Sequence, residues 1–283
     1  MQRALVLGGA TGLLGQAIVA KLKQTQEWDI TTLGRSDGDL FSQAFLTQKL
    51  EETRPDVVFN TVAWTQVDDA EDHPNEAHLV NAEFPKLLAA LLLRSSTHLV
   101  HFSTDFVFGA SSAHPLSEEE QPTPQSVYGR TKRAGEEAVL GLLPDRAAVL
   151  RTAWLFGPHR KNFVATIIHA AKSRKELKVV SDQVGSPTYT LDLAEWSIRL
   201  AQGRQHGIWH TVNADQSSWY ELAKTAVELA ELDCQVTPIP SSAWPQKAER
   251  PAYSVLSTDK LSSFLNEKVR SWKSALKDYL QAK

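Results

Sequence analysis

The segment Arg3-Ala4-Leu5-Val6-Leu7, followed directly by Gly8-Gly9-Ala10-Thr11-Gly12-Leu13-Leu14-Gly15, decides the fold. The first five residues predict a strand, and apolar residues at four-residue spacing predict a helix over residues 12–23. The G-x-x-G-x-x-G spacing lies at the turn between them, where it is typical of dinucleotide binding. Glycine lets the backbone approach a pyrophosphate, and the start of the helix presents N–H groups to it. A flexible turn without a ligand is the alternative.

The rest of the first half alternates short apolar runs with amphipathic stretches. The pattern predicts strands over residues 3–7, 29–33, 56–61, 97–103 and 147–151, and helices over 12–23, 41–53, 74–94 and 126–142. Strands that alternate with helices imply βαβ units and a parallel sheet. Right-handed crossovers then give an α/β, Rossmann-like doubly wound fold.

The second half is less regular and is interrupted by prolines. It predicts helices over residues 162–173, 190–201, 218–232 and 270–281, and strands over 177–180 and 207–212. We therefore expect a dinucleotide-binding domain over residues 1–150 and a smaller substrate-binding lobe over 151–283. The two are expected to be partly interleaved, with elements at about 190–212 returning to the main sheet.

Composition limits the classes of partner. The chain has 283 residues, 42% of them hydrophobic, and a net charge of −3, which gives no case for nucleic acid or an anionic membrane surface. The single cysteine, Cys234, excludes an internal disulfide and fits a reducing cytoplasm. The leucine-rich stretch Leu87–Leu93 is far shorter than the ~20 residues that cross a bilayer. We expect a cytoplasmic protein.

Tyr128 and Lys132 form a second motif within Val127-Tyr128-Gly129-Arg130-Thr131-Lys132. A spacing of four places both side chains on one face of a helix. A phenol titrates near pH ~10, and a neighbouring positive charge lowers that pKa. The pair therefore suggests proton transfer at a carbonyl or an alcohol, and with the glycine-rich turn it suggests hydride chemistry. The same spacing also arises by chance on amphipathic helices.

The end of the second strand bears on the choice of cofactor. It reads Leu33-Gly34-Arg35-Ser36, about 20 residues after the last glycine, where an acid would bind the ribose of NAD. An arginine suits the 2′-phosphate of NADP, so Arg35 favours NADPH over NADH, unless it is a solvated loop residue. We expect Asp39 and Leu40 against the adenine. Thr61-Val62-Ala63, after the third strand, is small enough to let the cofactor pass.

Several motifs together resemble the extended short-chain dehydrogenases/reductases, and within them the dTDP-4-dehydrorhamnose reductases, over almost the whole length. They are the glycine-rich turn, Asn60-Thr61-Val62-Ala63-Trp64-Thr65-Gln66-Val67-Asp68-Asp69-Ala70-Glu71, Ser103-Thr104-Asp105-Phe106-Val107-Phe108, Tyr128-Gly129-Arg130-Thr131-Lys132 with Gly135-Glu136, Arg151-Thr152-Ala153-Trp154, Asn162-Phe163, Asp182-Gln183-Val184-Gly185-Ser186-Pro187-Thr188 and Arg250-Pro251. The segments that begin at Asn60 and Asp182, and the pair Arg250-Pro251, are more particular to the reductases.

The resemblance implies roles for individual residues. Tyr128 would donate the proton, Lys132 would hold the ribose and tune the tyrosine, and Thr104 would hydrogen-bond the substrate carbonyl. The sugar site would be lined by Thr65, Val67, Asp105, Phe106 and Trp154. Arg250 would face the diphosphate of a nucleotide-sugar. The alternatives are a loop-capping hydroxyl for Thr104, a core aromatic for Trp154 and a surface ion pair for Arg250.

Two departures from the family pattern qualify these roles. Phe106 stands where the family is expected to have a tyrosine, which removes a hydroxyl from the sugar site. The surroundings of Gln16 lack the acid that some members use to bind a metal at a dimer contact, so we expect no metal and leave a homodimer open.

The function implied is NAD(P)H-dependent reduction of the C4 ketone of a nucleotide-linked 4-keto-6-deoxy sugar, with dTDP-4-dehydro-L-rhamnose giving dTDP-L-rhamnose. One alternative is a non-catalytic regulatory subunit like the animal methionine adenosyltransferase β-subunit. Another is a reductase or epimerase for a different nucleotide-sugar.

Overall fold

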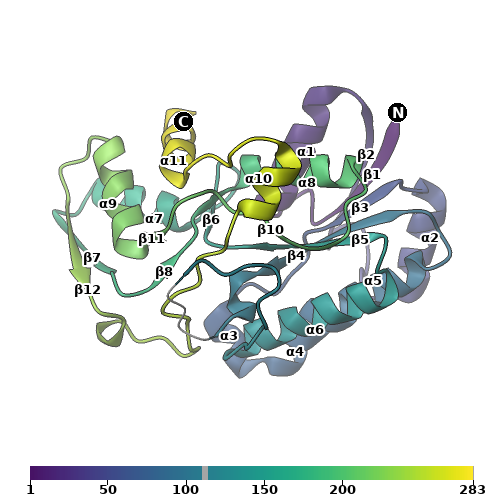
Figure 1. Cartoon of the computed structure of the whole chain (residues 1–283), viewed down its shortest axis with the longest axis horizontal. Helices are drawn as coiled ribbons and strands as arrows, with labels where there is room; N and C mark the ends of the chain where they lie inside the picture. Colours follow the sequence, from purple (N-terminus) through teal and green to yellow (C-terminus); the bar gives the residue numbers. More distant parts are fainter. Residues whose placement is uncertain (110–113, 283) are drawn as a thin grey trace.

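A parallel sheet of six strands lies at the centre of the computed structural model, which describes residues 1–109 and 114–282 (Figure 1). The strand order is β10-β5-β4-β3-β1-β2, and every neighbouring pair is parallel. The strands are β1 (Gln2–Leu7), β2 (Trp28–Leu33), β3 (Val57–Asn60), β4 (His98–Thr104), β5 (Ala147–Thr152) and β10 (Gly207–His210). All six lie where the sequence predicts strands, so the doubly wound α/β fold is confirmed.

The strand order reverses beside β1, which pairs with β2 on one side and β3 on the other. In open parallel sheets, ligands bind at such a switch point, outside the carboxyl ends of the strands. The glycine-rich turn leaves the carboxyl end of β1, and Thr104 stands at the carboxyl end of β4. The fold therefore brings the two motifs to one edge of the sheet.

Helices cover both faces of the sheet (Figure 1). One face packs against α1 (Leu13–Thr25) and α8 (Thr190–Gln202), and α1 turns the apolar row Leu14, Ile18 and Leu22 into that core. The other face packs against α5 (Phe84–Leu92) and α6 (Val127–Leu142), with α2 (Gln43–Thr53) beside α5. α8 and β10 come late in the sequence and belong to this layered body.

The single helix expected over residues 74–94 is interrupted, which corrects that prediction. The structure has α4 (Pro74–His78), a π-helical turn, η1 (Leu79–Glu83), and then α5. Pro85 has no N–H to donate to the carbonyl of Asn81, four residues earlier. That carbonyl instead faces α6, where a Cβ on Gly135 would lie 2.1 Å from it. The turn and the glycine let the two helices approach closely.

Outside the six-stranded sheet, the chain forms α7 (Phe163–Ala171), α9 (Trp219–Leu229), α11 (Trp272–Gln281) and a separate parallel pair, β7 (Glu176–Val180) with β12 (Gln235–Ile239). The strand predicted over 177–180 is present, but it does not join the main sheet. Shorter elements were not foreseen: α3 (Val67–Asp72), α10 (Asp259–Leu265), and the two-residue strands β6 (Leu155–Phe156), β8 (Val184–Gly185), β9 (Thr188–Tyr189) and β11 (Ser217–Ser218).

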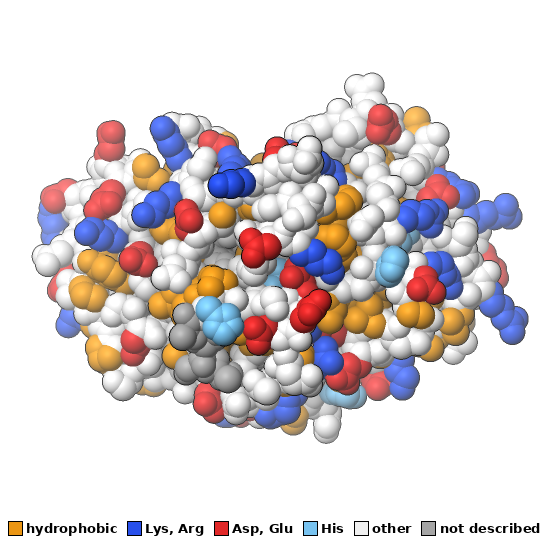
Figure 2. Space-filling model, viewed as in Figure 1, with side chains coloured by type: hydrophobic (Ala, Val, Ile, Leu, Met, Phe, Trp, Pro, Cys, Tyr) orange, Lys and Arg blue, Asp and Glu red, His pale blue; other side chains and the backbone are white. Residues whose placement is uncertain are grey.

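Side chains of both charges are interspersed over the face shown in Figure 2, without a continuous basic patch. Within residues 1–109 and 114–282, no helix is long and apolar enough to cross a membrane.

A buried ion pair fastens α6 to the sheet. Arg151, on β5, donates from Nε and one terminal nitrogen to the two carboxylate oxygens of Glu136, on α6, at 2.9 and 2.7 Å. Both side chains are completely buried, and the guanidinium also lies 5.0 Å from the centre of the Phe108 ring. The two-point contact fixes both the position and the rotation of α6.

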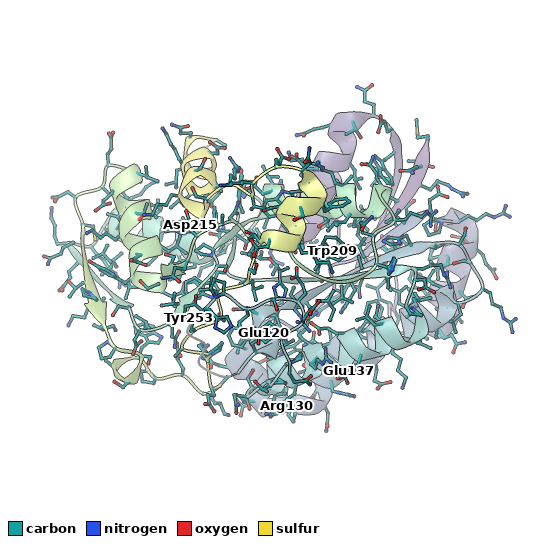
Figure 3. The ribbon with its side chains drawn as sticks, viewed as in Figure 1. Glu120, Arg130, Glu137, Trp209, Asp215 and Tyr253 are labelled. Atoms are coloured by element: carbon teal, nitrogen blue, oxygen red, sulfur yellow. The ribbon has the colours of Figure 1, made fainter. Side chains whose placement is uncertain are left out.

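Glu136→Gln should destabilise the protein by about 3–5 kcal/mol, because it leaves the Arg151 charge buried without its partner. The free energy of unfolding in urea measures the loss. Glu137→Gln is the matched control, since Glu137 points away from the sheet on the same helix and is 61% exposed (Figure 3). The control should change stability by less than about 1 kcal/mol. Equal losses in the two variants would contradict the structural role of the buried pair.

Candidate active site

The glycine-rich turn packs so closely that side chains are excluded from it. Gly8 has a φ of +80°, and its N–H donates to the carbonyl of Leu33 at 2.7 Å. A Cβ on Gly15 would lie 2.5 Å from the carbonyl oxygen of Gly8. No side chain caps α1 at Gly12, so the N–H groups of its first turn are directed out of the turn without a side-chain partner. Such a helix start can hold a pyrophosphate.

Arg35 follows β2 beside this turn. Its side chain is exposed, and it forms no ion pair with any residue in the described part of the chain. The nearby acid Asp37 closes the loop by accepting from the N–H of Gly34 at 2.8 Å. Asp39 likewise accepts from the N–H of Phe41 at 2.9 Å, and Leu40 is buried. Asp37 and Asp39 are thus used in hydrogen bonds within the loop, whereas the Arg35 side chain forms no ion pair among the described residues and could bind a ligand.

The segment after β3 is held by Asn81, which the sequence analysis did not identify. The Asn81 side chain accepts from the N–H of Trp64 at 2.9 Å and donates to the Trp64 carbonyl and to Thr131, at 3.2 and 3.1 Å. These bonds fix the chain that carries Thr61, Val62 and Ala63, all partly exposed. Pro85, four residues after Asn81, was the available signal for the π-helical turn that presents this side chain.

Thr104, Tyr128 and Lys132 are brought together from two elements. Thr104 ends β4, whereas Tyr128 and Lys132 lie on α6, which Ser126 caps by accepting from the N–H of Gly129. The Tyr128 phenol lies near the Thr104 hydroxyl, which lowers the pKa of the phenol. The Lys132 ammonium is buried and donates to the carbonyl of Phe102 on β4 at 2.5 Å. The spacing of four thus puts both residues against the same strand end.

The pKa values of this group differ from the expectation. Burial raises the pKa of Tyr128 to about 12, the Asp105 charge adds to the rise, and the neighbouring Thr104 hydroxyl opposes it. Burial lowers the pKa of Lys132 to about 8, although Glu136 opposes the change. The prediction that Lys132 lowers the tyrosine pKa is therefore wrong for this state of the protein, because desolvation dominates and the ammonium is directed at Phe102. A phenol that keeps its proton at neutral pH is suited to donate one.

Asp105 is directed into the protein. It is 2% exposed, and its two carboxylate oxygens accept from Ser254 at 2.6 Å and from Thr104 at 3.1 Å. Burial raises the pKa of Asp105 to about 6, while the Ser254 and Thr104 hydroxyls lower it. The neighbouring Phe106 ring meets the Tyr128 ring edge-on, with centroids 5.5 Å apart. Ser254 was missed because 149 residues separate it from Asp105.

On the other side of the site, Trp154 adopts a φ of +48°, which is unfavourable for a residue with a side chain. Its ring stacks on Trp219 at 3.6 Å with 8° between the planes, and a Cβ on Gly185 would lie 2.7 Å from it. Thr65 is exposed and Val67 is partly exposed at the start of α3. Trp219, at the start of α9, was also missed, since nothing in its local sequence marks it.

Arg250 forms an ion pair that bridges distant parts of the chain. Its terminal nitrogens donate to the two oxygens of Asp68, on α3, at 2.9 and 2.8 Å. The same carboxylate accepts from the N–H groups of Lys247 and Ala248, each at 3.0 Å. The Arg250 bonds hold the pKa of Asp68 at about 2. The arginine therefore ties the C-terminal part of the chain to α3.

A doubly wound sheet with a glycine-rich turn after β1 and a Tyr/Lys pair on α6 defines a Rossmann-type oxidoreductase. A family model described as the RmlD substrate binding domain matches residues 2–283, and the chain belongs to this family, that of the dTDP-4-dehydrorhamnose reductases.

Individual relatives agree with the family assignment. The chain is 42% identical over 278 residues to a probable dTDP-4,6-dihydroxy-2-methyloxan-3-one 4-ketoreductase of Streptomyces antibioticus, covering 96% of this chain and 93% of that protein. It is 39% identical over 280 residues to the dTDP-4-dehydrorhamnose reductase of Streptomyces griseus, covering 97% and 92%. The crystal structure of dTDP-4-dehydrorhamnose reductase from Bacillus anthracis in complex with NADP matches with a TM-score of 0.95, 31% identity and full coverage of both chains.

The metal expectation has no direct test. In the described ranges, no group of three or more His, Cys, Asp and Glu side chains is arranged to hold a metal ion. Independence from metals therefore stays a prediction.

Gly129→Ala should lower both stability and turnover. A Cβ at this position would lie 2.2 Å from the carbonyl oxygen of Phe106, so α6 must move, and Tyr128 with it. Strain of this kind costs about 1–3 kcal/mol. Gly141→Ala is the matched control on the same helix, because a Cβ there meets nothing within 4 Å. It should stabilise the protein by up to about 1 kcal/mol. Urea unfolding and turnover are measured for both, and normal turnover in Gly129→Ala would contradict the close contact.

Proposed function

We propose that the protein is an NAD(P)H-dependent reductase of the C4 ketone of a nucleotide-linked 4-keto-6-deoxy sugar, with dTDP-4-dehydro-L-rhamnose as the substrate and dTDP-L-rhamnose as the product. The observation that carries the proposal is the contact of the Tyr128 phenol with Thr104, above the buried Lys132 and at the same sheet edge as the glycine-rich turn. Relatives named as reductases of dTDP-4-keto-6-deoxy sugars support it.

The cofactor site fits a dinucleotide by the packing of its turn. Gly9, Gly12 and Gly15 would carry the pyrophosphate at the uncapped start of α1, together with the backbone of Ala10, Thr11, Leu13 and Leu14. Arg35 would bind a 2′-phosphate, with Asp39 and Leu40 toward the adenine and Thr61, Val62 and Ala63 along the path. The bound dinucleotide supplies the hydride. NADPH is the preferred cofactor and NADH the alternative.

The catalytic residues act on the oxygen of the substrate carbonyl. Tyr128 donates its proton to this oxygen as negative charge develops there, which is general acid catalysis. Thr104 positions the phenol, while its own proton is donated to Asp105. Lys132, held by Phe102 and paired at a distance with Glu136, places positive charge beside the phenolate that remains and binds the ribose of the cofactor.

The smaller lobe, drawn from residues 151–283 and partly interleaved with the dinucleotide-binding domain of residues 1–150, would hold the substrate against that domain. Thr65, Val67, Phe106 and Trp154 would line the sugar site, whereas Asp105 is buried and would act there only through Thr104. The positive φ of Trp154 is the kind of strain that functional sites retain. Arg250 contacts the diphosphate while Asp68 orients its planar guanidinium. A cytoplasmic location and a homodimer stay predictions.

The direct test is NAD(P)H oxidation with a panel of 4-keto-6-deoxy sugar nucleotides. Turnover of the dTDP-linked substrate, with stoichiometric formation of the C4 alcohol, is the expected result. Binding of the cofactor without turnover of any member, together with co-purification of a methionine adenosyltransferase, would favour a regulatory subunit instead. Turnover that inverts a C4 alcohol without net oxidation of the cofactor would favour an epimerase.

Arg35→Ala should weaken NADPH binding by about tenfold to a hundredfold, because a charge-assisted contact to a phosphate is worth about 1.5–3 kcal/mol. NADH binding should change little. Arg94→Ala is the control. Arg94 is an exposed arginine shortly before β4, so it lies toward the amino ends of the strands, away from the carboxyl ends where the cofactor is proposed to bind. Dissociation constants from fluorescence titration decide the matter. An equal effect of Arg35→Ala on both cofactors would place this arginine outside the 2′-phosphate site.

Tyr128→Phe should lower kcat by about 10²–10⁴-fold while the dissociation constant for NADPH stays nearly unchanged. The substitution removes the phenolic oxygen and keeps the ring that packs against Phe106. Tyr220→Phe, on α9, is a matched removal of a hydroxyl outside the site and should leave kcat unaltered. Near-normal turnover by Tyr128→Phe would remove the tyrosine from the mechanism.

A further inference from the structure

Residues 247–257, which we call the C-terminal strap, run from the Asp68 ion pair to the catalytic residues. Lys247 and Ala248 bind Asp68 through their N–H groups. Further on, the N–H of Ser254 donates to the carbonyl of Val184 at 2.8 Å, and the N–H of Leu116 donates to the carbonyl of Val255 at 2.8 Å. Tyr253, the residue before Ser254, forms an isolated bridge with Val184 of β8 (Figure 3 labels Tyr253). Backbone bonds thus hold the strap against α3, β8 and Leu116.

One side chain of the strap reaches the catalytic group. Ser254 is 2% exposed, and its hydroxyl donates to Asp105 Oδ2 at 2.6 Å. The other oxygen of that carboxylate accepts from the Thr104 hydroxyl at 3.1 Å. Two buried hydroxyls, from residues 150 positions apart in the sequence, therefore share one carboxylate.

The shared carboxylate matters for Thr104 because this residue has only one proton to donate. A threonine hydroxyl has one proton to donate and two lone pairs to accept with. The proton goes to Asp105, while the oxygen accepts from the N–H of Phe106 at 3.2 Å and lies near the Tyr128 phenol, whose pKa it lowers. The direction of the Thr104 hydroxyl, and with it the direction of the phenol, depends on how the carboxylate is held.

We propose that Ser254 is a positioning residue for the reduction: through the Asp105 carboxylate, its hydroxyl fixes the direction of the Thr104 hydroxyl beside Tyr128. The seated strap thereby completes the catalytic group. The inference rests on the roles proposed above for Thr104 and Tyr128, and it adds a residue from the opposite end of the chain.

The ionised carboxylate is the form that can accept from both hydroxyls. If Asp105 is protonated, one of its oxygens becomes a donor. Either the Ser254 or the Thr104 hydroxyl must then rotate so that it accepts this hydrogen bond instead of donating one. Among the described residues, three side chains face the Asp105 carboxylate. Ser254 from the strap and Thr104 from β4 present hydroxyls, and Tyr128 from α6 is an ionisable group whose pKa the Asp105 charge raises. Activity should therefore fall as the pH drops through the pKa of Asp105, about 6.

The test is Ser254→Ala, which removes the hydroxyl and keeps the backbone bonds of the strap. We expect kcat to fall about tenfold or more, as small misplacements of catalytic groups do, with the NADPH dissociation constant unchanged. The Ser254 hydrogen bond lowers the pKa of Asp105, so its loss raises that pKa, and the acid limb of the kcat profile should move to higher pH. A purely structural role would not shift this limb. Ser257→Ala is the matched control in the strap, because the Ser257 hydroxyl donates to Asp259.

Asp105→Asn provides the second variant. It should abolish the acid limb, and adding Ser254→Ala to it should change kcat little, since both substitutions break one chain of contacts. Independent, multiplying effects of the two would overturn the proposal, as would a wild-type kcat and pH profile in Ser254→Ala or an equal loss in Ser257→Ala.

Thr104→Val separates this failure from a failure of the proposed site. If Thr104→Val retains full turnover, the assignment of Thr104 to the catalytic group is wrong, and the role of Ser254 falls with it. If Thr104→Val is impaired while Ser254→Ala is normal in rate and pH dependence, only the role of Ser254 is wrong.

Discussion

The buried pair of Glu136 and Arg151 is the contact on which the arrangement of the active site depends. Lys132, four residues before Glu136, lies on the same face of α6, and so does Tyr128, four residues earlier again. Because Arg151 holds Glu136 from β5, the strand next to β4, the whole face is set against the carboxyl end of β4. A rotation of α6 that would move Tyr128 away from Thr104 would also separate two buried charges. An ion pair of this kind adds little net stability, yet strongly disfavours the arrangements that break it.

Burial, more than charge pairing, sets the chemistry at this strand end. It raises the pKa of both Tyr128 and Asp105 and lowers that of Lys132, so each group is shifted toward its neutral form. The sequence suggested that the lysine lowers the pKa of the tyrosine. Spacing alone indicates which groups are neighbours, but it does not indicate how strongly burial removes them from water. The structure instead presents a protonated phenol whose proton is directed by a chain of hydroxyls.

Features that depend on local pattern could be predicted from the sequence. All six strands of the main sheet, the glycine-rich turn and the Tyr/Lys helix follow from short-range periodicity and turn chemistry. The rest depends on contacts between distant residues. The π-helical turn reflects Pro85 together with Gly135 on another helix, and the pairing of β7 with β12 leaves a correctly predicted strand outside the main sheet. Ser254 and Asp68 meet their partners across 149 and 182 residues, a separation at which no local motif carries information.

Phe106 shows how a departure from a family pattern can leave the chemistry in place. Its backbone does the structural work: the N–H donates to Thr104, and the carbonyl lies where only a glycine at position 129 leaves room. Both interactions are made by backbone atoms, so they do not depend on which side chain residue 106 carries. The ring packs edge-on against Tyr128, so it can help to hold the phenol without offering a polar contact. The absent hydroxyl therefore bears on which sugar is accepted, because a site that cannot hydrogen-bond a substrate hydroxyl loses discrimination for it, while the proton donor keeps its place.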